Sequence, residues 1–115
     1  MFVLVLSALL ATASPFDGGG NVTAYEVANF ANAAPITGIC LSACTMRLST
    51  ASCVDRYAEL GFHEARSGGV RNDLATAQVA AHYKPRLRAW FLGGDLSILR
   101  VLRGYQLAHF GYKVC

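Results

Sequence analysis

In the stretch ITGICLSACTMRL, residues 36–48, a strand pattern is followed directly by a helix pattern, and this order indicates the class of fold. The stretch begins with β-rich residues 36–40, which are typical of a short strand. The composition from residue 41 to 48 predicts a helix, so Ser42 lies where a strand turns into a helix. Such a turn holds a serine hydroxyl at the mouth of a sheet, and the amide of Ala43 can then face a developing oxyanion. The competing interpretation is that Ser42 serves only as the N-cap of the helix.

A glycine-rich segment precedes this stretch. Three consecutive glycines at positions 18–20 cannot lie inside a helix or strand, so we expect a loop over residues 16–21. The apolar spacing of residues 22–31 then predicts a helix with Asn21 as its N-cap. Exposed amides of a glycine-rich turn that enters a helix can bind an anion or an oxyanion. A plain flexible connection is the alternative.

A histidine ends the next predicted strand. Residues 58–63 alternate as a strand would, and the separation 63 − 42 = 21 leaves room for one helix and one strand. The chain can therefore return beside Ser42. A neutral imidazole at His63 could accept the serine proton as a general base, although a lone histidine is more often structural.

The second half of the chain is expected to be mainly helical. Residues 66–69 read as a flexible loop, and residues 73–90 have a helical composition with a break at Pro85. We expect the last segment, residues 95–110, to be helical as well. The alternation of strand and helix around Ser42 predicts an α/β domain with parallel strands.

Length and composition exclude several classes of protein. A chain of 115 residues is most simply one domain, which we place at residues 14–115. Hydrophobic residues make up 54% and charged residues 15%, which argues against disorder. The net charge of +3 is far from the dense basic surface of a nucleic-acid binder, so we expect no nucleic-acid partner. We also expect no cofactor.

The four cysteines are disulfide candidates. Their even number is compatible with two disulfides in any of three connectivities, and disulfides suit an exported protein. The spacing of the first two is not that of a zinc ribbon, so we expect no metal site. These residues are Cys40, Cys44, Cys53 and Cys115.

The N-terminus has two interpretations. Residues 2–11 are apolar except for Ser7, and the small residues at 11–13 fit signal peptidase cleavage. Residues 1–13 would then be a signal peptide, and the protein would be periplasmic or secreted. The alternative is a first buried strand of a cytoplasmic protein. A membrane partner is expected only if residues 1–13 remain uncleaved as an anchor.

Three motifs in order carry a family resemblance. GGGNVTA at 18–24, GICLSA at 38–43 and ELGFHE at 59–64 together resemble the Clp protease proteolytic subunit and the wider Clp/crotonase superfamily, closest to a branch of exported bacterial Clp-like proteins. The resemblance implies repeated β-β-α units with a mainly parallel sheet, here short at its N-terminus. It implies Ser42 as nucleophile and His63 as base. It also implies oxyanion donors at the amides of Gly19, Gly20, Val22 and Ala43.

The resemblance leaves the acid of a catalytic triad open. Three acidic residues follow His63, namely Glu64, Asp73 and Asp95, and Asp95 is preferred by its distance along the chain. The expected function is that of a serine hydrolase acting on a peptide or ester, and a homo-oligomer is expected by resemblance only. The alternative is a catalytically inactive Clp-like interaction or structural module, a truncated family member in which the acid is lost and the N-terminal strand is reduced. The family's Ser-Pro before the glycines is also replaced here by Phe16-Asp17.

Overall fold

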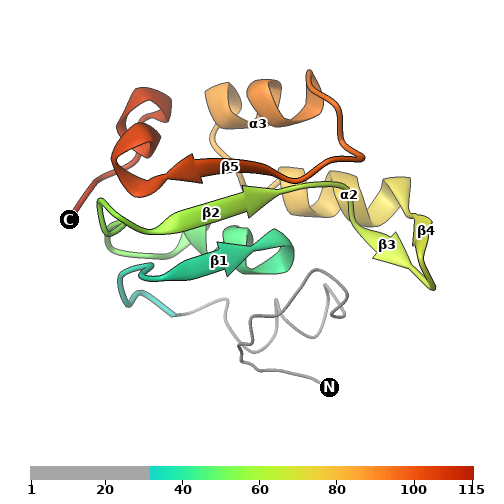
Figure 1. Cartoon of the computed structure of the whole chain (residues 1–115). Coiled ribbons are helices and arrows are strands. Elements are labelled where there is room, and N and C mark those ends of the chain that lie inside the picture. Colours follow the sequence, from blue (N-terminus) through green and yellow to red (C-terminus); the bar gives the residue numbers. More distant parts are fainter. Residues whose placement is uncertain (1–31) are drawn as a thin grey trace.

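The computed structural model describes residues 32–115, which form a mixed sheet with helices packed against it (Figure 1). The three strands of this sheet lie in the order β1-β2-β5, and two further short strands form a separate hairpin. The expectations for residues 1–13, for the glycine loop with Gly19, Gly20 and Val22, and for a helix at 22–31 lie outside the described residues. The elements are β1 Ile39–Leu41, η1 Ser42–Ser49, β2 Glu59–Phe62, β3 Arg66–Ser67, β4 Val70–Arg71, α2 Asp73–Ala80, α3 Pro85–Leu92, β5 Arg100–Arg103 and η2 Gly104–Phe110, where η marks a 3₁₀ helix.

The sheet contains one parallel and one antiparallel pair of strands. β1 pairs with β2 in parallel, as expected, with Leu41 opposite Gly61. β2 pairs with β5 in the antiparallel direction, with Leu60 opposite Leu102. The described sheet is therefore mixed, where a mainly parallel one was expected. The expectation that residues 95–110 are helical is wrong at β5, because a strand of four residues with one buried side chain leaves almost no periodic signal.

The strand predicted at residues 36–40 is shorter in the structure and begins later. Ile36 forms only an isolated bridge with Val54, and β1 begins at Ile39. Gly38, with a backbone φ of 66°, separates the two. This conformation is open to glycine and strained for other residues, so the chain bends there and restarts its pairing with β2. Val54 also pairs with Val114 and so brings the C-terminal end of the chain beside this bend.

The segment that we expected to be a flexible loop is a β-hairpin. Strands β3 and β4 pair through Arg66 with Arg71. Gly68 and Gly69 connect them with φ angles of 59° and 80°. Two successive residues with positive φ are what a type I′ turn requires, and this turn matches the twist of the paired strands. Pro85 begins α3 at its first turn, where the missing amide proton costs nothing, and confirms the predicted break in the helical region.

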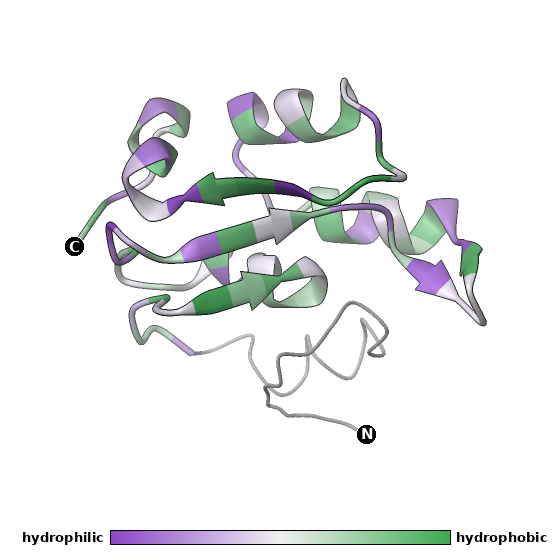
Figure 2. Cartoon of the chain, in the orientation of Figure 1, coloured by the Kyte–Doolittle hydropathy of each residue, from purple (hydrophilic) through white to green (hydrophobic). Residues whose placement is uncertain are grey.

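The core lies between the sheet and the helices. The central residues of the three strands, Cys40, Leu60 and Leu102, are cross-strand partners and are all buried. Phe62, at the end of β2, packs edge-on against Tyr83 and Trp90 with ring centroids 5.6 and 5.4 Å away. Figure 2 shows apolar residues along the middle of the strands and polar residues at the ends of β5.

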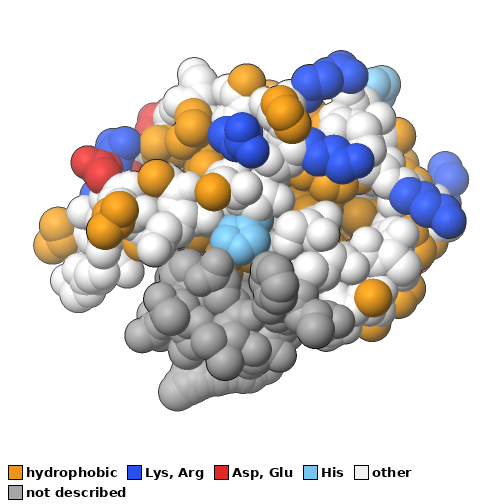
Figure 3. Space-filling model, turned by 180° about the vertical axis from the view of Figure 1, so that it is seen from behind, with side chains coloured by type: hydrophobic (Ala, Val, Ile, Leu, Met, Phe, Trp, Pro, Cys, Tyr) orange, Lys and Arg blue, Asp and Glu red, His pale blue; other side chains and the backbone are white. Residues whose placement is uncertain are grey.

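The surface carries dispersed charge. On the face seen from behind, Lys and Arg side chains lie separately along the upper half, with neutral and apolar atoms between them (Figure 3). Some Lys and Arg side chains of the described residues donate to backbone carbonyls of the same chain. Lys84 Nζ donates to the carbonyl of Gly111 at 2.7 Å, and Arg100 donates to the carbonyl of Phe91 at 2.6 Å.

Candidate functional site

Ser42 lies at a strained strand-to-helix turn. β1 ends at Leu41 and η1 begins at Ser42, as the sequence predicted. The N-cap position is held by Leu41, so the interpretation of Ser42 as the N-cap is wrong. Ser42 has a φ of 53°, and it is the only residue other than glycine with a positive φ among residues 32–115. This conformation is costly for a residue with a side chain and is found at functional turns.

A disulfide closes the chain around this turn. Cys40 on β1 is bonded to Cys44 on η1, with their Cα atoms 5.2 Å apart. This resolves the connectivity that the sequence left open. The second disulfide joins Cys53 to Cys115. The bond across four residues fixes the end of the strand to the first turn of the helix, and Ser42 lies midway between its two ends.

A short chain of hydroxyl groups also binds the backbone of Ser42. The Thr45 hydroxyl donates to the carbonyl of Ser42 at 2.5 Å. Its oxygen also lies 2.5 Å from the Tyr83 hydroxyl. Since the single Thr45 proton is used on Ser42, Tyr83 is the donor in the second contact. Burial raises the pKa of Tyr83 far above its usual range, so the phenol keeps the proton it donates.

His63 follows the strand next to the one that carries Ser42. β1 and β2 run parallel with Leu41 beside Gly61, so both strands end at the same edge of the sheet. Ser42 is the first residue after β1, and His63 is the first residue after β2. Ser42 is 5% exposed, and His63 is partly buried. Within residues 32–115 no hydrogen bond joins their side chains, which is common before a substrate binds.

Ala43, the proposed oxyanion donor that the structure describes, is the second residue of η1 and is buried. The first amides of a helix have no acceptor inside the helix. The N–H group of Ala43 is therefore at the end of η1 that offers donors to an outside group. The other three proposed donors, Gly19, Gly20 and Val22, lie outside the described residues.

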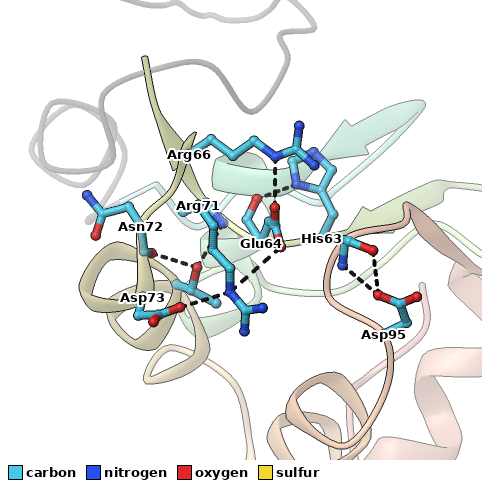
Figure 4. Close-up of polar contacts among 10 residues, drawn as sticks. His63, Glu64, Arg66, Arg71, Asn72, Asp73 and Asp95 are labelled. Carbon is cyan, nitrogen blue, oxygen red and sulfur yellow. Dashed lines mark hydrogen bonds and ion pairs between the residues drawn. The ribbon is translucent and has the colours of Figure 1, made fainter. Parts of the chain in front are cut away.

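Asp95 lies in the loop between α3 and β5, and its hydrogen bonds are made with Ser97. The carboxylate accepts from the backbone amide of Ser97 at 2.9 Å and from its hydroxyl at 2.6 Å. These bonds lower the pKa of Asp95, which is exposed. Within the described part of the chain, this carboxylate makes no hydrogen bond with His63 (Figure 4). The structure thus brings Ser42 and His63 to one edge of the sheet and leaves Asp95 bonded to Ser97.

A buried glutamate beside the histidine did not stand out in the sequence. Glu64 is 5% exposed, and its carboxylate binds Arg66 at 3.0 Å and Arg71 at 3.7 Å. Arg71 also binds Asp73 at 2.8 Å (Figure 4). A carboxylate is rarely buried unless it is paired, so the hairpin that supplies both arginines is what keeps Glu64 inside. The only sequence signal was an acid directly after a predicted strand and two arginines around a Gly-Gly turn.

The described residues define a small mixed α/β protein with two disulfides. Disulfides persist in oxidising compartments, so the bonds fit a protein from outside the cytoplasm. No helix among residues 32–115 is long and apolar enough to cross a membrane. The same residues hold no group of three His, Cys, Asp or Glu side chains that could bind a metal. Comparison with protein-family models and with curated proteins finds no match for this chain.

Proposed function

We propose that the chain is a serine hydrolase of the Clp/crotonase-like type that acts on a peptide or ester substrate. One observation supports this proposal above the others. The single non-glycine residue with positive φ in the described chain is the serine at the end of β1, and it lies at the same sheet edge as the histidine that follows β2. A strained strand-to-helix turn that presents a serine is the geometry of an activated nucleophile.

The reaction would run by covalent catalysis. The Ser42 oxygen attacks the substrate carbonyl while His63 accepts its proton. The oxyanion of the tetrahedral intermediate binds the amide of Ala43 together with the proposed donors Gly19, Gly20 and Val22. His63 then protonates the leaving group. The bond to the leaving group breaks and an acyl-enzyme remains on Ser42. Water then attacks the acyl carbonyl while His63 accepts a proton from it. When the second tetrahedral intermediate collapses, the bond to the Ser42 oxygen breaks, His63 returns the proton to that oxygen, and the acid product leaves.

The proposal also covers the type of fold, the cellular compartment and the oligomeric state. Parallel pairing of β1 and β2 around a strand, helix and strand is compatible with one β-β-α unit of the Clp/crotonase fold, short at its N-terminus. The two disulfides favour a periplasmic or secreted protein. A homo-oligomer is proposed by resemblance alone.

The test is labelling of the purified protein with a fluorophosphonate probe, which reacts with activated serines. We expect the wild type to be labelled and Ser42→Ala to be silent. His63→Gln should lower the labelling rate by about 100-fold or more, because general-base catalysis contributes on that scale. Ser49→Ala is the matched control, since Ser49 lies exposed at the other end of η1 and bonds only the Met46 carbonyl. It should be labelled like the wild type.

The second candidate is a catalytically inactive interaction or structural module of the same fold. It is favoured by the burial of Ser42, which is 5% exposed, and by the bonding of Asp95 to Ser97. Absence of labelling in a protein that is folded by circular dichroism would support this candidate and contradict the hydrolase. Equal labelling of the wild type and Ser42→Ala would show that another residue reacts with the probe and would contradict Ser42 as the nucleophile.

A further inference from the structure

The Nδ1 atom of the His63 imidazole is hydrogen-bonded to the backbone. Nδ1 lies 2.5 Å from the backbone carbonyl oxygen of Glu64 (Figure 4). A carbonyl oxygen carries no proton and can only accept, so the contact is favourable only when Nδ1 holds the proton. In a neutral imidazole the proton on Nδ1 leaves Nε2 with its lone pair free. This is the tautomer that a general base needs.

The Glu64 carbonyl is fixed through the other end of its peptide unit. The amide of Ala65, in the same peptide unit as the Glu64 carbonyl, donates to the Thr76 hydroxyl oxygen at 2.9 Å. Because a peptide unit is planar, fixing its N–H on one side fixes its C=O on the other. Thr76 is 3% exposed and lies on α2, and its own hydroxyl proton goes to the carbonyl of Asn72 at 2.8 Å.

Two further bonds fix the neighbouring atoms. The amide of Glu64 donates to the carbonyl of Leu96 at 2.7 Å, and the amide of Asn72 donates to the carbonyl of Ala65 at 2.8 Å. The buried carboxylate of Glu64 is bound by Arg66 and Arg71. Every polar group around the Glu64–Ala65 peptide therefore has a partner, and the peptide has no alternative orientation that would keep these bonds.

We propose that the Glu64–Ala65 peptide unit, anchored by Thr76, orients His63 in place of a triad carboxylate. Its carbonyl accepts a hydrogen bond from the Nδ1–H group, so that Nε2 is presented to Ser42, and Thr76 is the positioning residue. The inference rests on the proposed hydrolase function. It assigns to a backbone carbonyl the task that an acid performs in a Ser-His-Asp triad, which is to fix the tautomer and the direction of the ring.

The test reads the tautomer directly, without activity. Long-range ¹H–¹⁵N spectra of the ¹⁵N-labelled full chain distinguish a protonated from an unprotonated ring nitrogen, and the His63→Gln variant assigns the signals. In the neutral imidazole of the wild type we expect the proton on Nδ1. Thr76→Val, which keeps the shape but loses the hydroxyl, should give a mixture of tautomers and a fluorophosphonate labelling rate lower by about tenfold or more. Thr76→Ser keeps the hydroxyl and should behave as the wild type.

Asp95→Asn tests the alternative that Asp95 orients the ring, and we expect it to leave the tautomer of His63 unchanged. The proposal is overturned if wild-type His63 carries its proton on Nε2, if Thr76→Val leaves the spectrum as it was, or if Asp95→Asn shifts the tautomer. The wild-type spectrum alone decides the first of these, so failure of Thr76→Val to fold does not remove the test. If the wild type has the expected tautomer but is not labelled by the probe, the hydrolase function is overturned, whereas the proposed orientation of His63 is supported.

Discussion

Ser42 holds a left-handed backbone conformation that costs about 1 kcal/mol or more for a residue with a Cβ atom. The surroundings supply the restraint that such a conformation needs. The Cys40–Cys44 disulfide spans it, and the Thr45 hydroxyl binds its carbonyl. Tyr83 completes the chain of hydroxyls from the core. At the scale of single residues, the turn at Ser42 therefore depends on a tyrosine that lies 41 positions away along the chain (83 − 42).

The raised pKa of Tyr83 predicts a loss of stability at alkaline pH. The ordinary tyrosine pKa is 10.0, and burial raises that of Tyr83 well above it. A raised folded-state pKa means that the folded protein keeps the proton when the unfolded chain releases it. The stabilisation by the neutral phenol is thus complete below about pH 10 and is lost progressively as the pH rises above that value.

The measurement is urea unfolding of the wild type and Tyr83→Phe between about pH 7 and pH 11. The variant should lose about 1 kcal/mol at neutral pH with its hydrogen bond, and its alkaline slope should be shallower. Tyr57→Phe is the control, because Tyr57 is 68% exposed, and its curve should follow the wild type. Parallel curves for the wild type and Tyr83→Phe would contradict the prediction.

At the scale of elements, the site is made by two strand ends that the sheet places side by side. Parallel pairing of β1 and β2 puts the residues after both strands at one edge, and α2 supports that edge through Thr76. β5 closes the other side of β2 and continues directly into η2. The junction between β5 and η2 packs closely against the loop before β2 through Gly104.

Gly104→Ala tests this junction. A Cβ atom at Gly104 would lie 1.7 Å from the backbone oxygen of Asp55, and the backbone of both segments would have to move. We expect a loss of about 3 kcal/mol or more in the free energy of unfolding. Gly68→Ala is the matched control, since its Cβ would meet nothing within 4 Å and only its φ of 59° opposes the change. It should lose about 1 kcal/mol, and an equal loss in both variants would refute the explanation.

At the scale of the whole molecule, two disulfides of very different span hold the described chain together. Cys53–Cys115 closes a loop of sequence separation 62, whereas Cys40–Cys44 closes one of 4. The long link ties the C-terminal residue to the bend before β2, where Val54 pairs with Val114. It therefore restricts the unfolded chain far more than the short link does.

The paired alanine variants should separate these two roles. From loop entropy we expect Cys53→Ala/Cys115→Ala to lower the free energy of unfolding by about 4 kcal/mol, and Cys40→Ala/Cys44→Ala by about 2 kcal/mol. Chemical unfolding of both, with unchanged far-ultraviolet circular dichroism before denaturation, measures the difference. A greater loss in the short-loop variant would show that the turn at Ser42 contributes more to stability than loop entropy allows.

Local features of the fold can be predicted from the sequence, because each of them depends on residues that are neighbours along the chain. The strand that runs into Ser42, the strand that ends just before His63 and the helix break at Pro85 were all predictable from residue type and spacing. The Gly68–Gly69 turn could also have been predicted, since two such glycines favour a hairpin.

Features that join residues far apart along the chain depend on the tertiary structure. The antiparallel strand β5 has too few core-facing side chains to produce a recognisable sequence pattern. Its position is set by pairing with β2. The disulfide connectivity, the burial of Glu64 and the bond from Thr76 to Ala65 likewise depend on which segments meet in space. The partner of His63 belongs to the same class. A backbone carbonyl is present at every position of a sequence, so only the folded geometry can select the one that orients the ring.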